Sequence, residues 1–339
     1  MKYDNIKPPC VDSPTDHKKY VNEAGNREEG RVVIQDPEMR IKALAPWFGG
    51  NRTFARRAGA ELGRLGWCGV LFAGGMPELP EINTSAGVAV DKHRHLINLA
   101  RVVSDDRLLL QLIRRVDRLL FHEDVLAEAQ RRCLDREHAK TCGLFGSNDA
   151  AADAEPDVSW AADYYTACWM GRGGYAGRGG ELTQSIAVRY TASGGSSAKR
   201  WRSAVESLPA WGKVLERWQF VCDDAFDVLG RLKPQEKAGL YLDPPWVGAG
   251  DEYTFRFGRD DHARLARHLR RLSMYRIVLR YGDDPLIRAL YPESEGWTWI
   301  ESTTRDQRNG EVNEVLIVNG PSLTKGWANN SAANKGKGT

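Results

Sequence analysis

The sequence has few cysteines, no long apolar run and little net charge. Its six cysteines include no Cys-x-x-Cys pair, which argues against a metal site or a disulfide framework and favours reduced thiols in a cytoplasm. No apolar run approaches the length of a membrane span, and the polar start lacks a signal-peptide core. A formal net charge of +3 is too small to indicate a nucleic-acid partner by itself.

What the sequence does contain is strand and helix patterns that alternate in two regions. With 42% apolar residues, the chain can bury a sizeable core. Residues 40–103 and 218–320 are predicted to form one α/β domain, with the less regular residues 104–217 inserted between its halves. Residues 1–39 are charged and aperiodic and are predicted to be a poorly ordered lead-in. Residues 321–339, rich in Asn, Ala, Lys and Gly, are predicted to be a flexible tail.

The first region has the pattern of a nucleoside-binding half-sheet. The apolar run 69–72 predicts a strand that leads into a glycine turn at 73–75. A second strand is predicted over 87–91, where it ends on Asp91, and apolar spacing predicts a helix over 96–103. Asp91 is then placed to accept from ribose hydroxyls, and the alternative is that it only caps the helix.

The middle region combines helices with a basic stretch. Helices are predicted over 108–120 and, rich in aromatics, over 160–170, with a surface insertion at 146–156 and a flexible loop at 171–180. Between 171 and 202 six basic residues accompany one acid, Glu181; the basic residues are Arg172, Arg178, Arg189, Lys199, Arg200 and Arg202. This stretch is a candidate phosphate-contacting surface, although a solvated loop explains the same charges.

The second region returns to strand and helix. Strands are predicted over 239–242, ending at Asp243, and over 275–281, with a helix over 262–272 capped by Asp260 or Asp261. Paired strands are predicted over 297–301 and 312–318, with a turn at Asn309-Gly310. The expected fold is a doubly wound α/β sheet with its site at the carboxyl ends of the strands.

The strand end Asp243-Pro244-Pro245-Trp246 points to chemistry on an aromatic amine. Two prolines stiffen the loop and remove two N–H donors, so that the loop presents carbonyls. Asp243 and the Pro244 carbonyl could hold both N–H groups of an amine and localise its lone pair for attack on a methyl group, with Trp246 as a stacking face for an extruded base. Four residues alone do not exclude a plain strand-ending turn with Trp246 as packing.

Seven segments in order resemble the D12-class (Dam-like, alpha-group) adenine-N6 DNA methyltransferases over roughly residues 45–319. The segments are 47–51, 72–75, 91–97, 171–177, 220–226, 260–269 and 313–319. The resemblance implies a Rossmann-like S-adenosylmethionine-dependent methyltransferase sheet with an inserted, mostly helical target-recognition region at 104–217. It also implies methyl transfer to N6 of a flipped adenine in double-stranded DNA, as in restriction-modification or phage modification.

The same resemblance assigns site residues. Asp243, Pro244, Pro245 and Trp246 are expected to be catalytic. The residues expected to bind S-adenosylmethionine are Trp47, Gly49, Gly50, Asn51, Phe72, Gly74, Gly75, Asp91 and Asp224. Those expected to contact DNA are Arg172, Tyr175, Arg178, Lys199 and Arg200. No metal is expected, and the protein is expected to be a monomer in the cytoplasm of a bacterium or a phage-infected cell.

The sequence also departs from the family pattern. Asn51 replaces a lysine, with Arg52 beside it as a source of charge; Met76 replaces a loop glycine; Val70-Leu71 replaces Glu-Pro; and Ala176 replaces an asparagine. Three alternatives stay open. A cytosine-N4 methyltransferase of this type usually carries Ser in place of Asp243. A dinucleotide-binding oxidoreductase needs a fuller Gly-x-Gly-x-x-Gly turn. A non-catalytic DNA-binding relative would keep the fold alone.

Overall fold

The computed structural model describes residues 43–49, 52–141, 155–172, 176–188, 190–191, 195–233, 235–248, 253–305 and 311–325. By its contacts the chain divides into two units, Met1–Glu38 and Met39–Thr339, and every described residue belongs to the second. The predicted lead-in, most of the 146–156 insertion, most of the tail and the Asn309-Gly310 turn lie outside the described residues. In the described part, no helix combines the length and apolar character needed to cross a membrane.

The centre of the second unit is a seven-stranded sheet in the order β5-β2-β1-β6-β7-β9-β8. Its strands are β1 (Leu65–Leu71), β2 (Thr84–Val90), β5 (Trp218–Val221), β6 (Ala238–Leu242), β7 (Arg276–Gly282), β8 (Trp297–Arg305) and β9 (Glu311–Asn319). The first five strands of that order pair in parallel, whereas β9 runs antiparallel to both β7 and β8. The expected α/β fold is confirmed as a mixed, mostly parallel sheet flanked by helices.

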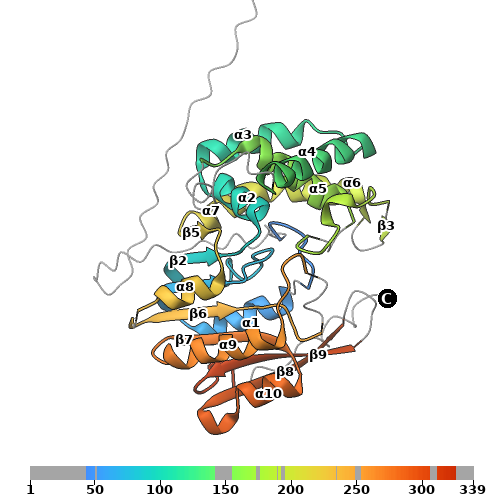
Figure 1. Cartoon of the computed structure of the whole chain (residues 1–339). Coiled ribbons are helices and arrows are strands. Elements are labelled where there is room, and N and C mark those ends of the chain that lie inside the picture. Colours follow the sequence, from blue (N-terminus) through green and yellow to red (C-terminus); the bar gives the residue numbers. More distant parts are fainter. Residues whose placement is uncertain are drawn as a thin grey trace, which may run out of the picture. The chain divides into compact units, whose positions relative to one another are not determined.

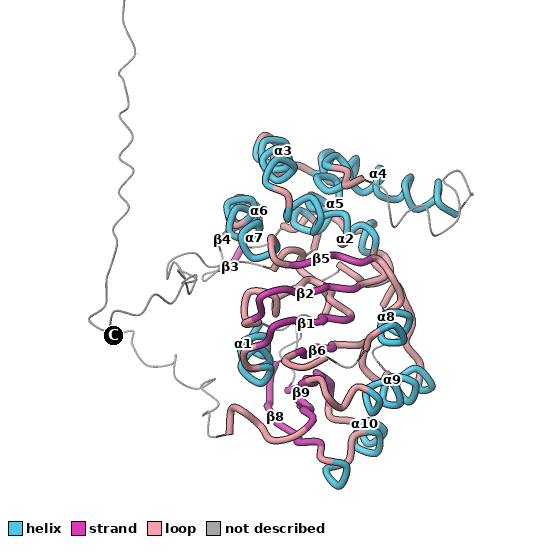
Figure 2. Tube along the Cα trace, turned by 90° about the vertical axis from the view of Figure 1, so that its left-hand side faces the viewer, coloured by secondary structure: helices cyan, strands magenta, loops and turns pink. Residues whose placement is uncertain are grey.

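Helices cover both faces of this sheet, as Figure 2 shows. On one face lies α1 (Arg52–Leu62), which contacts β6 and β7. On the other lie α8 (Ala225–Arg231), α9 (Arg259–Arg271) and α10 (Pro285–Leu290). Every residue of β6 is therefore buried, which explains why the central strands are continuous apolar runs rather than alternating ones.

The start of α9 corrects a sequence prediction. We expected Asp260 or Asp261 to cap this helix from outside, but the N-cap is Gly258 and the helix already includes both acids. Asp261 occupies the third helical position, and its carboxylate accepts the Gly258 N–H at 2.9 Å. The acid thus reaches back over the first turn, as in a capping box, because the extended backbone at Gly258 supplies the cap without a side chain.

A helical region lies beyond β5, at the upper end of Figure 1. It contains α2 (Arg94–Ser104), α3 (Asp106–Asp117), α4 (Glu123–Thr141), α5 (Val158–Met170), α6 (Ser197–Glu206) and α7 (Leu208–Leu215). The short hairpin of β3 (Tyr190–Thr191) and β4 (Gly195–Ser196) precedes α6, and the single turn η2 (Glu181–Thr183) precedes β3. A second single turn, η4 (Glu293–Glu295), lies outside this region, between α10 and β8. Helix α5 is buried from Ala161 to Met170 because α2, α3, α4 and α6 all pack on it.

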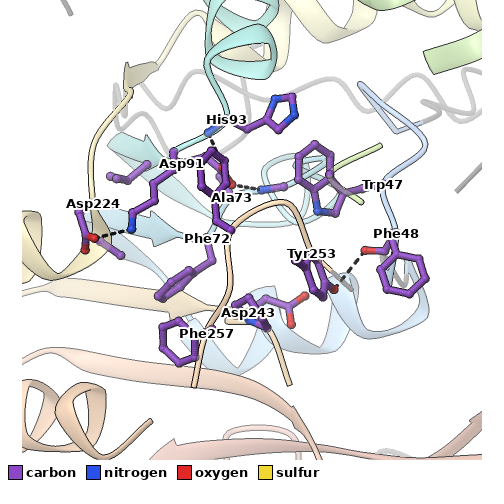
Figure 3. A pocket seen from close by; sticks show the side chains of 18 of the residues that line it. Trp47, Phe48, Phe72, Ala73, Asp91, His93, Asp224, Asp243, Tyr253 and Phe257 are labelled. Carbon is purple, nitrogen blue, oxygen red and sulfur yellow. Dashed lines mark hydrogen bonds and ion pairs between the residues drawn. The ribbon is translucent and has the colours of Figure 1, made fainter. Parts of the chain in front are cut away.

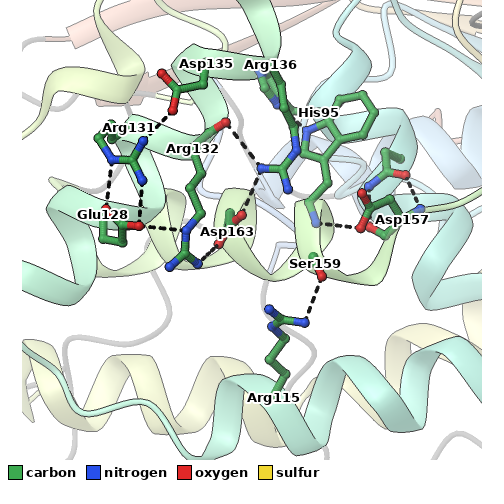
Figure 4. A network of polar contacts seen from close by, with 12 residues as sticks. His95, Arg115, Glu128, Arg131, Arg132, Asp135, Arg136, Asp157, Ser159 and Asp163 are labelled. Atoms are coloured by element: carbon green, nitrogen blue, oxygen red, sulfur yellow. Dashed lines mark hydrogen bonds and ion pairs between the residues drawn. The ribbon is translucent and has the colours of Figure 1, made fainter.

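A polar network holds these helices together (Figure 4). The buried Asp163 carboxylate on α5 pairs with Arg132 at 3.1 Å and Arg136 at 2.9 Å, both on α4. On the other side of α5, the Asn98 side chain of α2 bonds the backbone N–H and carbonyl of Asp157. Two arginines on one buried carboxylate leave it no unpaired charge, so that α4 is fixed in register against α5.

Candidate active site

A cavity opens at the carboxyl ends of β1, β2, β5 and β6 (Figure 3). Counted out to its open mouth, the empty space between the lining residues is about 1050 Å³. Several of the site residues predicted from the sequence line this cavity. They are Trp47, Phe72, Gly74, Gly75, Asp91, Asp224, Asp243 and Pro245. The fold therefore brings together residues that are separated by almost 200 positions in the sequence.

The glycine loop after β1 leaves no room for side chains. A Cβ on Gly75 would lie 2.6 Å from the Ala45 carbonyl, and one on Gly74, whose φ is +46°, would lie 2.9 Å from the Trp47 ring. Met76 also has positive φ, at 58°, although its side chain is fully buried. The left-handed backbone is thus present at the position where the family pattern has glycine, with strain that the burial of Met76 offsets.

Asp91 ties this loop to the start of α2. One carboxylate oxygen accepts the Gly74 N–H at 2.9 Å, and the other accepts the His93 N–H at 2.9 Å. Burial raises the pKa of Asp91, and these two bonds act against the rise. The helix-cap alternative is wrong, because His93 is the N-cap of α2 and accepts the Leu96 N–H on its own ring nitrogen. A carboxylate can accept about four hydrogen bonds, so Asp91 keeps capacity for a ligand hydroxyl.

A buried ion pair backs the Trp47 wall of the cavity. The His93 Nε2 lies 2.5 Å from Glu181, whose second oxygen accepts the Gly177 N–H at 2.5 Å. Trp47 meets the His93 ring edge-on, with centroids 5.3 Å apart, and a Cβ on Gly177 would lie 2.2 Å from Trp47. The loop that carries Arg178 is therefore anchored directly on this wall. Sequence reasoning missed His93 and Glu181, which are 88 residues apart.

At the other end of the cavity two stacked aromatic rings lie beside a carboxylate. Phe226 and Phe257 stack with planes 11° apart, and the Arg264 guanidinium lies 4.1 Å over the Phe226 ring. Asp224 precedes α8 and pairs with Lys92 at 2.6 Å. Burial acts to raise the pKa of Asp224, but Lys92 and the Phe226 N–H hold it below its ordinary value. An aromatic wall beside a carboxylate suits a flat ring that carries N–H donors.

Asp243 lines the cavity beside the buried side chains of Arg280 and Glu78. Its Oδ2 accepts from Arg280 Nη1 at 2.6 Å, and burial raises its pKa while Arg280 acts to lower it. Glu78 also lines the cavity, accepts the Tyr241 hydroxyl at 3.1 Å, and has a pKa that burial raises to about 8. Two carboxyl groups whose pKa values burial raises thus share one wall. The motif search found neither Glu78 nor Arg280.

Comparison with known proteins adds no assignment: no protein-family model matches the chain, and no significant match was found among curated proteins. The chemistry of the cavity must therefore carry the functional argument. Within the described ranges no cluster of three or more His, Cys, Asp or Glu side chains has the arrangement to hold a metal ion.

Trp246 lies apart from the cavity. It is half-buried and packs over Gly282, where a Cβ would approach its ring to 2.9 Å, and beside Arg280. It also contributes a hydrogen bond that lowers the pKa of Asp243. Its expected role as a stacking face has no support in this arrangement. Tyr253 instead lines the cavity, with its ring edge-on to Phe48 at 5.4 Å (Figure 3).

The remaining nominated residues lie outside the cavity or outside the described residues. Gly49 is exposed, and its carbonyl accepts from Arg280. Pro244 is buried, whereas Gly50, Asn51 and Tyr175 are not among the described residues. Of the residues expected to contact DNA, Arg178 lies 5.0 Å over the Phe48 ring, Arg172 is exposed, and Lys199 and Arg200 belong to the first turns of α6.

Proposed function

We propose that the protein is an S-adenosylmethionine-dependent DNA methyltransferase that methylates the N6 amine of a flipped adenine. One observation carries the proposal: a single cavity holds both a nucleoside-type site around Asp91 and the carboxylate of Asp243 at the end of an Asp-Pro-Pro strand. A methyl donor built on a nucleoside and an acceptor amine must meet in such a space.

The residues present fit S-adenosylmethionine. The aromatic wall of Phe226 and Phe257, with Asp224 nearby, suits an adenine ring and its amine. Asp91 retains acceptor capacity for ribose hydroxyls, and the cradle at Gly74 and Gly75, which a Cβ would fill, lets a methionine chain approach the backbone. When bound, this cofactor supplies an electrophilic methyl group on a positively charged sulfur.

The Asp-Pro-Pro loop suits an aromatic amine as acceptor. Asp243 offers carboxylate oxygens to one N–H and the Pro244 carbonyl can accept the other, which localises the nitrogen lone pair. Because both prolines restrict the backbone and Arg280 holds the carboxylate, the acceptors need no rearrangement when the amine arrives. The proton released after transfer can pass to a carboxylate of this wall and from there to solvent.

The wall beside Asp243 suits a base taken out of its stack. Tyr253 and Phe48 present aromatic surface there, and aromatic stacking is the usual way to hold a flipped base. Arg178 contacts Phe48, and the exposed Arg172 and Lys199 belong to the same inserted region. These cations are suited to the phosphates that flank the flipped nucleotide.

The described structure argues to different degrees against the three alternatives, which are a dinucleotide-binding oxidoreductase, a cytosine-N4 methyltransferase and a non-catalytic DNA-binding relative. A dinucleotide-binding sheet ends in a parallel sixth strand, whereas here the antiparallel β9 lies between β7 and β8, which weighs against the oxidoreductase alternative. Asp243 favours adenine over cytosine N4. A non-catalytic relative would have no need to retain Asp243 with a dedicated arginine in the ligand cavity.

The test is methyl transfer from radiolabelled S-adenosylmethionine to unmethylated double-stranded DNA, followed by sequencing of the modified bases. We expect incorporation and N6-methyladenine in a fixed sequence context. N4-methylcytosine as product would establish the cytosine alternative instead. If calorimetry detects no S-adenosylmethionine binding and no label is incorporated, while DNA is still bound, the protein is the non-catalytic relative.

A further inference from the structure

A row of charged side chains crosses three adjacent strands on the face of the sheet that α1 covers. Asp243 follows β6, Arg280 lies on β7, and Glu314 lies on β9. The register pairs Leu242 with Leu279 and Gly282 with Glu314, so that Arg280 is the near neighbour of both acids. Its guanidinium also lies 5.9 Å from the Phe54 ring of α1, which places the row beneath that helix.

All five N–H donors of Arg280 are used. Nε and Nη2 donate to Glu314 at 3.2 and 3.0 Å, and Nη1 donates to Asp243 at 2.6 Å. Nη1 and Nη2 both donate to the Gly49 carbonyl at 3.0 Å. The side chain is 2% exposed. An arginine buried this completely, with every donor matched, is held in one orientation, and so are the groups that accept from it.

We propose that Arg280 is a positioning residue for the proposed methyl transfer: it keeps Asp243 ionised and oriented, and it docks the Gly49 segment against that carboxylate. The inference rests on the proposed function, because Asp243 matters only if an amine binds there. Where the family pattern has a lysine two residues after Gly49, this chain has Asn51. Among the side chains that the structure describes, Arg280 of β7 reaches the Gly49 carbonyl, whereas the side chain of Arg52, which the sequence suggested as a source of charge, is not described.

The electrostatics agree with the geometry. The groups that interact with Asp243 are Arg280, Glu314, Glu78, Tyr241, Tyr281 and Trp246. Burial raises the pKa of Asp243, Arg280 and a Trp246 hydrogen bond lower it, and Glu314 raises it. Without the guanidinium, the carboxyl groups of Asp243, Glu314 and Glu78 would lie near one another with no cation among them. Asp243 would then bind a proton more readily and lose acceptor capacity for the amine.

The test is a pH titration of Asp243 itself. NMR of protein labelled with ¹³C at the aspartate carboxyl carbons monitors the titration, and the Asp243→Asn variant identifies the Asp243 signal. In Arg280→Gln we expect the midpoint to rise by about one pH unit or more. The matched control is Arg276→Gln, because Arg276 lies on the same strand and pairs with the buried Glu61 but does not contact Asp243. An unmoved midpoint in Arg280→Gln, or an equal rise in both variants, overturns the inference.

Two further variants keep the test valid if Arg280→Gln does not fold. Glu314→Gln removes an acid that raises the pKa of Asp243, so its midpoint should fall below that of the wild type. Arg280→Gln/Glu314→Gln removes one cation and one anion and leaves the net charge of the row unchanged. We expect its midpoint to lie about one pH unit or more above that of Glu314→Gln. Equal midpoints in these two variants contradict the role of Arg280.

Methyl transfer then separates this inference from the proposed function. If the wild type transfers methyl groups, Arg280→Gln should lower kcat by roughly 10²-fold and change KM for S-adenosylmethionine much less. The acidic limb of the kcat pH profile should also shift to higher pH. A fall in kcat that is the same at every pH contradicts positioning. If the wild type transfers none but the Asp243 midpoint still shifts, the proposed function fails and the link between Arg280 and Asp243 stands.

Discussion

The Asp91 carboxylate at the end of β2 accepts the backbone N–H of Gly74, in the loop after β1, at 2.9 Å. Its other oxygen accepts the His93 N–H at the start of α2. One side chain therefore sets the relative position of a glycine cradle and a helix start, which are the two parts of the proposed cofactor site. A substitution at Asp91 can therefore disturb the geometry of this site without removing the other residues that line the cavity.

Replacing Asp91 by Asn should weaken S-adenosylmethionine binding. The amide keeps the shape but has one acceptor oxygen, so one of the two N–H groups at Gly74 and His93 loses its partner. We expect Kd to rise at least about tenfold, measured by calorimetry. Asp106→Asn, at an exposed acid on α3, serves as the control. Equal affinity in the two variants would remove Asp91 from the cofactor site.

Gly177→Ala should displace the Trp47 wall. At φ +80° an added Cβ would lie 2.2 Å from the Trp47 ring, which cannot be accommodated without movement. Gly296 has φ +87° with nothing within 4 Å, so Gly296→Ala has similar backbone strain without the clash. We expect both variants to lose roughly 1–2 kcal/mol of unfolding free energy from strain, and Gly177→Ala to lose more and to bind cofactor at least about tenfold more weakly. Calorimetry that gives one Kd for both would rule out a role for the Trp47 wall in binding.

Asp243→Ala should abolish methyl transfer and leave DNA binding largely intact. The substitution removes the acceptor for the target amine, whereas the cations expected to contact DNA lie on other elements. Label incorporation and fluorescence anisotropy with a DNA duplex measure the two properties in the same preparation. Methyl transfer at the wild-type rate in this variant would contradict the proposed mechanism.

Tyr253→Ala and Trp246→Ala should separate base stacking from support of Asp243. Tyr253 lines the cavity, so its loss should weaken binding of a flipped base by about 1–3 kcal/mol, visible as weaker 2-aminopurine fluorescence at the target position. Trp246 packs over Gly282, so its loss should lower the unfolding free energy by about 3 kcal/mol in urea titrations. The opposite pattern would restore Trp246 as the stacking residue.

The pair of His93 and Glu181 should stabilise the fold most in mild acid. Burial opposes the charged His93, but Glu181 raises its pKa above 6.5; burial likewise opposes the charged Glu181, but His93 lowers its pKa below 4.5. The His93 contribution is complete below pH 6.5 and is lost as pH rises through the raised value. That of Glu181 is complete above pH 4.5 and is lost as pH falls through the lowered value.

His93→Gln should therefore destabilise the protein more at about pH 5.5 than at about pH 8.5, in urea titrations at both values. His95→Gln is the control of opposite sign. Burial lowers the pKa of His95, so its contribution is present above pH 6.5 and is lost as pH falls. A loss of stability in His93→Gln that does not depend on pH would mean that the pair is not ionised.

The sequence by itself determined much of the local structure and two of the acids that line the cavity. Apolar runs that end on Asp91 and Asp243 predicted β2 and β6, and helices α2 and α5 followed from apolar and aromatic patterning, because a side chain that must be buried leaves a period in the sequence. Since the carboxyl ends of parallel strands meet at one edge, these acids could also be expected to lie near one cavity.

Tertiary structure alone decided which groups act on those acids. Arg280 lies 37 residues beyond Asp243 in a strand that looks entirely structural, and the order of β6, β7 and β9 makes them neighbours. The same holds for the pairing of His93 with Glu181 and for Tyr253, which lines the cavity in the place proposed for Trp246. Buried polar pairs are set by the docking of distant elements and leave no period, so only the assembled sheet and helices reveal them.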